Sequence, residues 1–238
     1  MHPIICHIGP LTIYSYGLMF AIAVFTASYL ASRATTKIGV PPEIAYDLTF
    51  WVVIVGVACA RIGYVFLNWD YFISAPLEIV MLQHGGLAWQ GGFIGGVAAG
   101  VIYLRIKKVR FWPFLDVIAP YIALGHAIGR IGCFLNGCCY GKPASWGLFY
   151  PVWQERMQPT QLYMVLGQLV IFLILRYAQL RVKKTGQVFV LYLLLSSVER
   201  FLVEFPRADH EVYFGLSIFQ YVCIVIFAVA LLVNRKLK

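Results

Sequence analysis

The sequence predicts an all-α integral membrane protein, and three observations support this prediction. Of its 238 residues, 61% are hydrophobic and 12% are charged, whereas a soluble domain is about half apolar and about a quarter charged. Seven apolar stretches are long enough, or nearly so, to cross a bilayer. The chain has no alternating pattern of the kind that membrane barrels show, so helices are expected.

The expected transmembrane helices cover residues 14–32, 46–67, 83–104, 112–134, 160–177, 186–204 and 213–233. The sequence has no internal repeat and no low-complexity segment, so residues 1–238 are expected to form a single transmembrane domain. The first stretch lacks a preceding basic residue and a following small-residue cleavage pattern. It is therefore interpreted as a retained span and not as a signal peptide.

The distribution of lysine and arginine predicts the orientation. Thirteen of the 19 basic residues follow spans one, three, five and seven, while three lie in the opposite loops and three lie within spans. Because cytoplasmic loops are enriched in basic residues, the N-terminus is expected outside and the C-terminus in the cytoplasm. The net charge of +9 is thus a topology signal, and no nucleic-acid partner is expected.

The three basic residues within spans are Arg61, Arg130 and Arg200. Each lies near the predicted outer end of its span, about 6–12 Å below the boundary at about 1.5 Å per residue. His84 and Tyr16 open neighbouring spans on the same side. Snorkelling explains a single arginine near a helix end, but this grouping favours a phosphate site at the depth of the outer headgroups, since guanidinium binds phosphate through two parallel hydrogen bonds.

The sixth span ends with a charged series in which Arg200, Glu204 and Arg207 are four and three residues apart. This spacing places them on one face of a helix. In one interpretation, these residues form a salt-bridge ladder whose charges neutralise one another. In the other, Glu204 orients Arg200 towards a substrate phosphate. The two interpretations are compatible.

His84 begins a segment with seven glycines between residues 85 and 100. Glycines four residues apart favour close packing of helices. His84-Gly85-Gly86 lies at the predicted mouth of the span, where glycine lets the backbone approach a ligand. Histidine is the usual general base near neutral pH, although a lone interfacial histidine has many structural roles.

Cys133, Cys138 and Cys139 follow His126 in a glycine-rich turn. Their spacing matches no standard zinc pattern, so no metal and no cofactor are expected. Cys6, Cys138 and Cys139 lie on the predicted outer side, where a disulfide is permitted. The sequence leaves open whether one forms.

Several short motifs, in this order and spacing, resemble those of the bacterial prolipoprotein diacylglyceryl transferases over nearly the whole chain. They are Tyr16–Met19, Ala60–Tyr64, His84–Leu87, Gly129–Gly132, Asn136-Gly137 with Gly141, Pro159–Tyr163 and Arg200–Arg207. The resemblance implies a seven-helix enzyme of the bacterial inner membrane with its active site facing the outer leaflet. It would move the diacylglyceryl group of phosphatidylglycerol onto the lipobox cysteine in the signal peptide of a preprolipoprotein, releasing glycerol phosphate.

The resemblance also implies site residues. Those expected to be catalytic are His84, Arg130, Arg200, Tyr16 and Glu204, and those expected to bind phosphatidylglycerol are Arg130, Arg200, Arg207, Asn136, Gly141 and Arg61. The chain departs from the commonest family motifs at Cys133, Cys138, Met164 and Ser196, where asparagine, glutamate, glutamate and tyrosine are usual. Roles tied to those usual side chains are not transferred.

Two other classes of protein are alternatives to a transferase. A transporter for an anionic solute predicts charges along a path, a site near the midplane and often repeated halves. A purely structural membrane subunit leaves the arginine cluster unexplained. Release of glycerol phosphate from labelled phosphatidylglycerol in the presence of a lipobox peptide separates these classes from the transferase.

Overall fold

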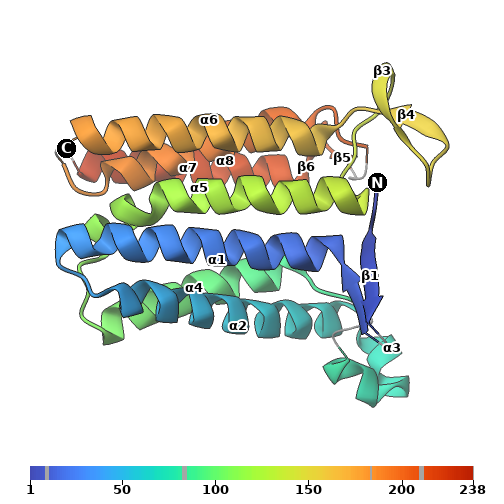
Figure 1. Cartoon of the computed structure of the whole chain (residues 1–238), viewed down its shortest axis with the longest axis horizontal. Coiled ribbons are helices and arrows are strands. Elements are labelled where there is room, and N and C mark those ends of the chain that lie inside the picture. The colour runs from blue at the N-terminus through green and yellow to red at the C-terminus, as the bar shows by residue number, and fades with distance from the viewer. Residues whose placement is uncertain (9–10, 82–84, 183, 209–211, 238) are drawn as a thin grey trace. The chain divides into compact units, whose positions relative to one another are not determined.

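The computed structural model of the chain describes residues 1–8, 11–81, 85–182, 184–208 and 212–237 (Figure 1). The long helices are α1 (Ser15–Thr35), α2 (Pro42–Leu67), α4 (Trp89–Ile106), α5 (Phe111–Asn136), α6 (Thr160–Arg181), α7 (Gln187–Glu204) and α8 (Ile218–Lys236). The short helical elements are η1 (Thr36–Ile38), α3 (Trp69–Ser74) and η2 (Pro76–Val80).

A long helix occurs at each of the seven predicted positions. Within the described residues, five helical segments are long and apolar enough to cross a membrane: Ser15–Ile38, α2, α5, α6 and α8. The all-α membrane architecture therefore agrees with the prediction. The helices α4 and α7 have 18 residues each, and the count of seven spans, like the orientation, stays a prediction.

In the described residues, one small antiparallel hairpin precedes the first helix and two others lie between helices, and the sequence did not predict them. They pair β1 (Ile4–Ile8) with β2 (Leu11–Tyr14), β3 (Pro143–Tyr150) with β4 (Glu155–Met157), and β5 (Val212–Tyr213) with β6 (Leu216–Ser217). Strands of two to eight residues are too short to produce a clear alternating pattern in the sequence.

The chain divides into two compact units. The first contains residues 1–34 and 112–238, and the second contains residues 35–111. In the first unit, the N-terminus and the C-terminus lie at opposite ends (Figure 1). The single-domain prediction is not tested by this division.

The core of the first unit lies where α5, α6 and α7 meet. Ala119, Ala123, Ile171, Leu175 and Val188 are buried together there. Small alanines on α5 let the larger aliphatic side chains of the neighbouring helices pack closely, and burial of those side chains stabilises the contact.

A partly buried carboxylate holds the start of α7 against α5. Asp116 accepts hydrogen bonds from the backbone N–H of Gly186 and, at 2.8 Å, from that of Phe189. The first N–H groups of a helix have no partner within the helix, so this contact satisfies two of them. A negative charge is also favourable at a helix N-terminus.

Glycines bring α2 and α4 together in the second unit. A Cβ atom built on Gly91 would clash with the carbonyl group of Cys59, and one on Gly95 would lie 2.6 Å from the Cys59 sulfur. Only glycine permits this approach of the two backbones. The close packing predicted from the small residues four apart is therefore confirmed.

The outer face of α6 is apolar and exposed. Leu166, Leu173 and Leu180 recur every seven residues and are 63%, 64% and 82% exposed. Residues seven apart lie on nearly the same side of a helix. Such a stripe is unfavourable in water and is what a helix presents to lipid.

Candidate functional site

One end of the first unit gathers the candidate polar residues. The helices α5 and α7 finish there, and α1, α6 and α8 begin there (Figure 1). The chain segments between these helix ends bring Arg200, Glu204, Arg207 and the 136–142 loop into contact.

Glu204 is the centre of this arrangement. Its side chain is only 2% exposed, and its Oε2 atom lies 3.0 Å from Nη2 of Arg200 and 3.8 Å from Nε of Arg207. The Ser217 hydroxyl donates a hydrogen bond of 2.9 Å to Oε1. The salt-bridge ladder predicted from the four- and three-residue spacing is confirmed, and a buried carboxylate holds two guanidinium groups in place. The expected shared helix face is wrong for Arg207, because α7 ends at Glu204 and Arg207 lies after the following turn, bridged to Gly141.

Arg200 has two further contacts. Its Nη1 atom lies 3.6 Å from the sulfur of Met164, and its guanidinium lies 5.0 Å from the ring centroid of Phe219. An aromatic face attracts a cation, so the guanidinium plane is fixed between α6 and α8. Met164 stands where the commonest family motif has glutamate, and here that position supplies a weakly accepting sulfur.

Arg130 lies on α5 and has a different environment. Its Nε atom donates a hydrogen bond of 3.2 Å to Nε2 of His126, one turn earlier. Arginine is always a donor, so His126 accepts through this nitrogen and is neutral. In the described part of the chain, His126 is the hydrogen-bond partner of Arg130. The fork formed by the two Nη groups is therefore available to a phosphate.

Gly141 joins the loop after α5 to the segment that carries Arg207. The two residues form an isolated antiparallel bridge, and the N–H of Lys142 donates 2.7 Å to the carbonyl of Pro206. A Cβ atom on Gly141 would lie 2.8 Å from that carbonyl and 2.7 Å from Cβ of Gln158. This contact requires glycine, which gives Gly141 a positioning role.

A buried polar network fixes the same loop from α6. Gln161 donates 2.6 Å to the carbonyl of Cys138, and Thr160 donates 2.6 Å to the carbonyl of Cys139. The Tyr150 hydroxyl donates 2.9 Å to Oε1 of Gln161. Because Gln161 and Thr160 are buried, these bonds are shielded from water and hold the loop firmly.

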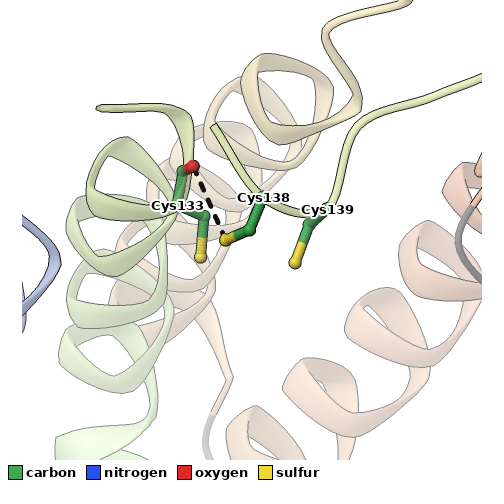
Figure 2. Close-up of side chains that lie close together, drawn as sticks. All are labelled: Cys133, Cys138 and Cys139. Carbon is green, nitrogen blue, oxygen red and sulfur yellow. Dashed lines mark hydrogen bonds between the residues drawn. The ribbon is translucent and has the colours of Figure 1, made fainter. Parts of the chain in front are cut away.

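Three cysteines lie together beside Arg130. Figure 2 shows Cys133 on α5 and Cys138 and Cys139 on the following loop, with their sulfurs directed to one side. The sulfurs all lie within 4.8 Å of one another. All six cysteines of the chain are free thiols, so the disulfide left open by the sequence is not formed.

The charge around these thiols is positive. Hydrogen bonds from the Cys133 and Cys138 side chains, together with the charges of Arg207 and Arg130, lower the pKa of the Cys139 thiol. The pKa of the Cys138 thiol is raised instead, because its hydrogen bond with Cys139 and its burial outweigh the opposite effect of Cys133. Cys139 is therefore the loop thiol favoured as thiolate, the form that binds metals or reacts. The sequence did not predict this grouping, because one ligand comes from a helix and two from a loop.

Tyr16 and Asn136 complete the end of this unit. Tyr16 is the second residue of α1, is 46% exposed, and interacts electrostatically with Arg130 and with Cys133. Asn136 is the last residue of α5, and its side chain contacts the Cys138 thiol. Tyr16 thus lies near Arg130, and Asn136 lies beside the cysteines of the following loop.

Arg61 lies in the second unit and is only 6% exposed. It donates to the carbonyls of Glu78, Ile79, Met81, Gly85 and Gly86. A guanidinium has five N–H donors, so each has a backbone partner. These bonds show a positioning role for the segment before α4. Binding of phosphatidylglycerol by Arg61 stays a prediction, and no donor remains for it in this arrangement.

His84, the predicted base, lies outside the described residues. The hydrogen bonds of Arg61 to Gly85 and Gly86 fix the backbone directly after it. Its role in the reaction therefore stays a prediction.

The structure adds two polar residues that the sequence did not single out. Gln168 donates 2.6 Å to Oε2 of Glu199, and Oε1 of Glu199 is buried without a hydrogen-bond partner in the described part of the chain. Glu199 interacts electrostatically with Arg130 and Arg200. Two features of the sequence could have indicated this network. Glu199 directly precedes Arg200, and His126 and Arg130 are four residues apart.

The long apolar helices define a multi-pass membrane protein, and three arginines interact at one end of its first unit. Residues 3–234 match the sequence model of the family described as "Prolipoprotein diacylglyceryl transferase". The chain belongs to this family. It is therefore a transferase of lipoprotein biosynthesis, and the resemblance stated from its motifs is confirmed.

Similar proteins support this assignment. The chain is 35% identical to a protein of Bacillus cytotoxicus over 97% of this chain and 91% of the relative. It is 36% identical to one of Geobacillus kaustophilus, over 98% and 92%, and 35% identical to one of Synechococcus elongatus, over 97% and 85%. Each of the three is named phosphatidylglycerol--prolipoprotein diacylglyceryl transferase.

Proposed function

We propose that this transferase moves the diacylglyceryl group of phosphatidylglycerol onto the lipobox cysteine thiol of a preprolipoprotein. A sulfur–carbon bond forms at the glycerol carbon that bears the phosphate ester. The carbon–oxygen bond to the phosphate breaks, the thiol proton is lost, and glycerol phosphate leaves. No cofactor takes part in this displacement.

The observation that carries the proposal is the grouping of three guanidinium groups at one end of the first unit. Arg130, Arg200 and Arg207 interact electrostatically with one another or with Glu204 and Glu199. Arg130 and Arg200 are both partly buried. A partly buried charge favours a partner of opposite sign, and the phosphodiester of phosphatidylglycerol carries one negative charge.

The arginines have distinct roles in this proposal. Arg130 and Arg200 bind the phosphate, because a planar fork donates two parallel charge-assisted hydrogen bonds. Glu204 and Arg207 fix the orientation of Arg200. Negative charge grows on the departing phosphate as the carbon–oxygen bond breaks, so fixed cations at this position lower the barrier.

The acceptor thiol must lose its proton before it attacks. A cysteine thiol has a pKa near 8.5, so only a small fraction is ionised at neutral pH. His84 is proposed as the base, and the arginine field lowers the barrier further by stabilising the thiolate. Tyr16 is proposed to hydrogen-bond the headgroup.

The proposed topology has seven spans, with the N-terminus outside and the site at the outer leaflet of the bacterial inner membrane. The helices α4 and α7, of 18 residues each, measure about 27 Å at about 1.5 Å per residue. That length is close to the thickness of about 30 Å of the hydrocarbon core. The basic loops support the orientation.

The experiment that tests the proposal follows the lipid headgroup. The purified protein is incubated with a lipobox peptide in vesicles that contain phosphatidylglycerol labelled in its glycerol headgroup. We expect release of labelled glycerol phosphate and a thioether-linked peptide in equal amounts. Phosphatidylethanolamine with the same acyl chains serves as the control and should not react.

Equal turnover of the two lipids would refute the phosphate clamp, because a zwitterionic headgroup offers no net negative charge. Uptake of an anionic solute without any thioether product would favour a transporter instead.

A further inference from the structure

The three clustered cysteines have a geometry that the proposed transfer reaction does not need. The acceptor thiol belongs to the peptide, and the commonest family motif has asparagine and glutamate in place of Cys133 and Cys138. Nevertheless, the sulfurs of Cys133, Cys138 and Cys139 all lie within 4.8 Å of one another (Figure 2).

The backbone of the loop is shaped to bring these sulfurs together. Cys139 has a φ of 61°, in the left-handed region that a residue with a side chain seldom adopts. Side chains of successive residues in an extended chain point to opposite sides, but here Cys138 and Cys139 turn the same way (Figure 2). Strained conformations of this kind persist where the surroundings fix them, often at functional sites.

The surroundings do fix this loop. The carbonyls of Cys138 and Cys139 each accept a hydrogen bond of 2.6 Å, from Gln161 and Thr160 respectively. Cys133 is held on the last turns of α5 and is buried. The three sulfurs are therefore positioned before any ligand arrives, which reduces the entropy lost on binding.

The spacing suits a metal ion bound by thiolates. A zinc–sulfur bond is about 2.3 Å long, so two sulfurs on a tetrahedral zinc ion are about 3.8 Å apart. Sulfurs that already lie within 4.8 Å reach this separation through small side-chain rotations. Thiolate ligands select soft ions such as Zn²⁺ and Cu⁺ over Mg²⁺ or Ca²⁺.

The charge balance also favours a thiolate site. Three thiolates around Zn²⁺ carry a net charge of −1. Arg130 lies three residues before Cys133 on α5, and both Arg130 and Arg207 interact electrostatically with Cys139. These cations compensate the excess negative charge, as supporting groups around metal sites commonly do.

We propose that Cys133, Cys138 and Cys139 form a binding site for Zn²⁺, with three protein thiolates and a fourth position open to water. The ion would join the end of α5 to the loop that pairs with the segment carrying Arg207. Metal binding displaces the thiol protons to solvent and leaves the oxidation states unchanged. The proposal does not depend on the transferase reaction, since binding is measured without substrate.

The test uses Co²⁺ as a coloured probe for the zinc site. The full-length protein, reduced and freed of metal in detergent micelles, is titrated with Co²⁺ and then with Zn²⁺. We expect one Co²⁺ per chain, a sulfur-to-cobalt charge-transfer band, and displacement of the cobalt by Zn²⁺. Zn²⁺ alone should also raise the unfolding temperature, because an ion that binds the folded state stabilises it.

Two variants and a control locate the ligands. Cys138→Ser and Cys139→Ser should each weaken Co²⁺ binding by more than about 100-fold, beyond the loss expected from a merely supporting contact. Cys6→Ser changes an exposed thiol and should bind Co²⁺ as the unmodified protein does. Since both loop cysteines are only partly buried, the variants are expected to fold, and their unfolding temperatures without metal verify this.

Three results would overturn the proposal. The first is Co²⁺ binding that is equally strong in both loop variants. The second is absence of binding to a protein with all six thiols titratable after denaturation. The third is a pair of observations: protein purified without reductant has only four free thiols, and the reduced protein does not bind Co²⁺. Together they would show that two cysteines of the cluster form a disulfide and that the cluster holds no metal.

Discussion

Two buried arginine sites in this chain have opposite properties. In the second unit, Arg61 directs its donors to five backbone carbonyls. At the end of the first unit, Arg200 and Arg207 share Glu204, while Arg130 contacts a neutral histidine. The first site is saturated, and the second groups three guanidiniums with Glu204 and Glu199.

The difference shows how similar arginines near helix ends take different roles. A guanidinium surrounded by carbonyls organises the chain, since it has no donor left for a ligand. A guanidinium that keeps its fork of two Nη groups, as proposed for Arg130, is suited to an anion instead. The depth predicted for an arginine in the membrane therefore does not by itself identify it as a ligand-binding residue. The partners of each arginine side chain decide its role.

The largest expected effect is on turnover, and it comes from a substitution that removes the two parallel donors of Arg130. Arg130→Lys keeps the charge and loses the two parallel donors, so kcat/KM with phosphatidylglycerol vesicles should fall by about 100- to 1,000-fold. The unfolding temperature should change little. Turnover close to that of the unmodified protein would show that Arg130 merely extends its charge to the membrane surface.

A second substitution tests the saturated site. Lysine has three donors, so Arg61→Lys leaves at least two of the five carbonyls without their partner. Each buried group without a partner costs about 1–3 kcal/mol, so with two such carbonyls the free energy of unfolding should fall by about 2–6 kcal/mol. Denaturant unfolding in micelles measures this loss.

If Arg61→Lys instead keeps its stability and loses affinity for phosphatidylglycerol, Arg61 belongs with the lipid-binding arginines and the contrast between the two sites fails.

A third change removes the shared charge of the second site. Glu204→Gln keeps an acceptor for Ser217 and leaves Arg200 and Arg207 without their carboxylate. Turnover should fall by about 10- to 100-fold, because a misplacement of about 1 Å in a positioned group costs up to about 100-fold. Glu155→Gln, the same change at an exposed position of β4, is the matched control and should retain activity.

Equal activity of the two glutamine variants would mean that Arg200 is oriented by its contacts with Met164 and Phe219 alone.

The smallest effect concerns the contact between the loop and the Arg207 segment. Gly141→Ala places a Cβ atom 2.8 Å from the Pro206 carbonyl, so the unfolding free energy should fall by about 1–3 kcal/mol. Gly129→Ala has no atom within 4 Å of its new Cβ and should be neutral or slightly stabilising, since alanine favours a helix. Thermal unfolding of both variants measures the difference.

A Gly141→Ala variant as stable as Gly129→Ala would indicate that the loop shifts freely, and that the bridge to Arg207 does not position the site.

The sequence by itself determined the features that depend on neighbouring residues along a helix. Hydropathy placed seven long helices, because an apolar stretch must satisfy its backbone internally in lipid. The Arg200–Glu204 pair followed from helical periodicity, whereas Arg207 lies beyond the end of α7 and reaches Glu204 through the turn that follows. The packing of α2 against α4 was also predicted, since glycines four residues apart always fall on one face.

The tertiary structure decided which distant groups became partners. The carbonyls that bind Arg61 lie 17 to 25 residues further along the chain, and no helical period relates them. Cys133 meets Cys138 and Cys139 because the loop after α5 turns back and is held by Gln161 and Thr160 of α6. Hydrogen bonds between remote segments depend on the tertiary fold. The spacing of residues in the sequence therefore predicted neither the saturation of the Arg61 donors nor the contact of the three cysteines.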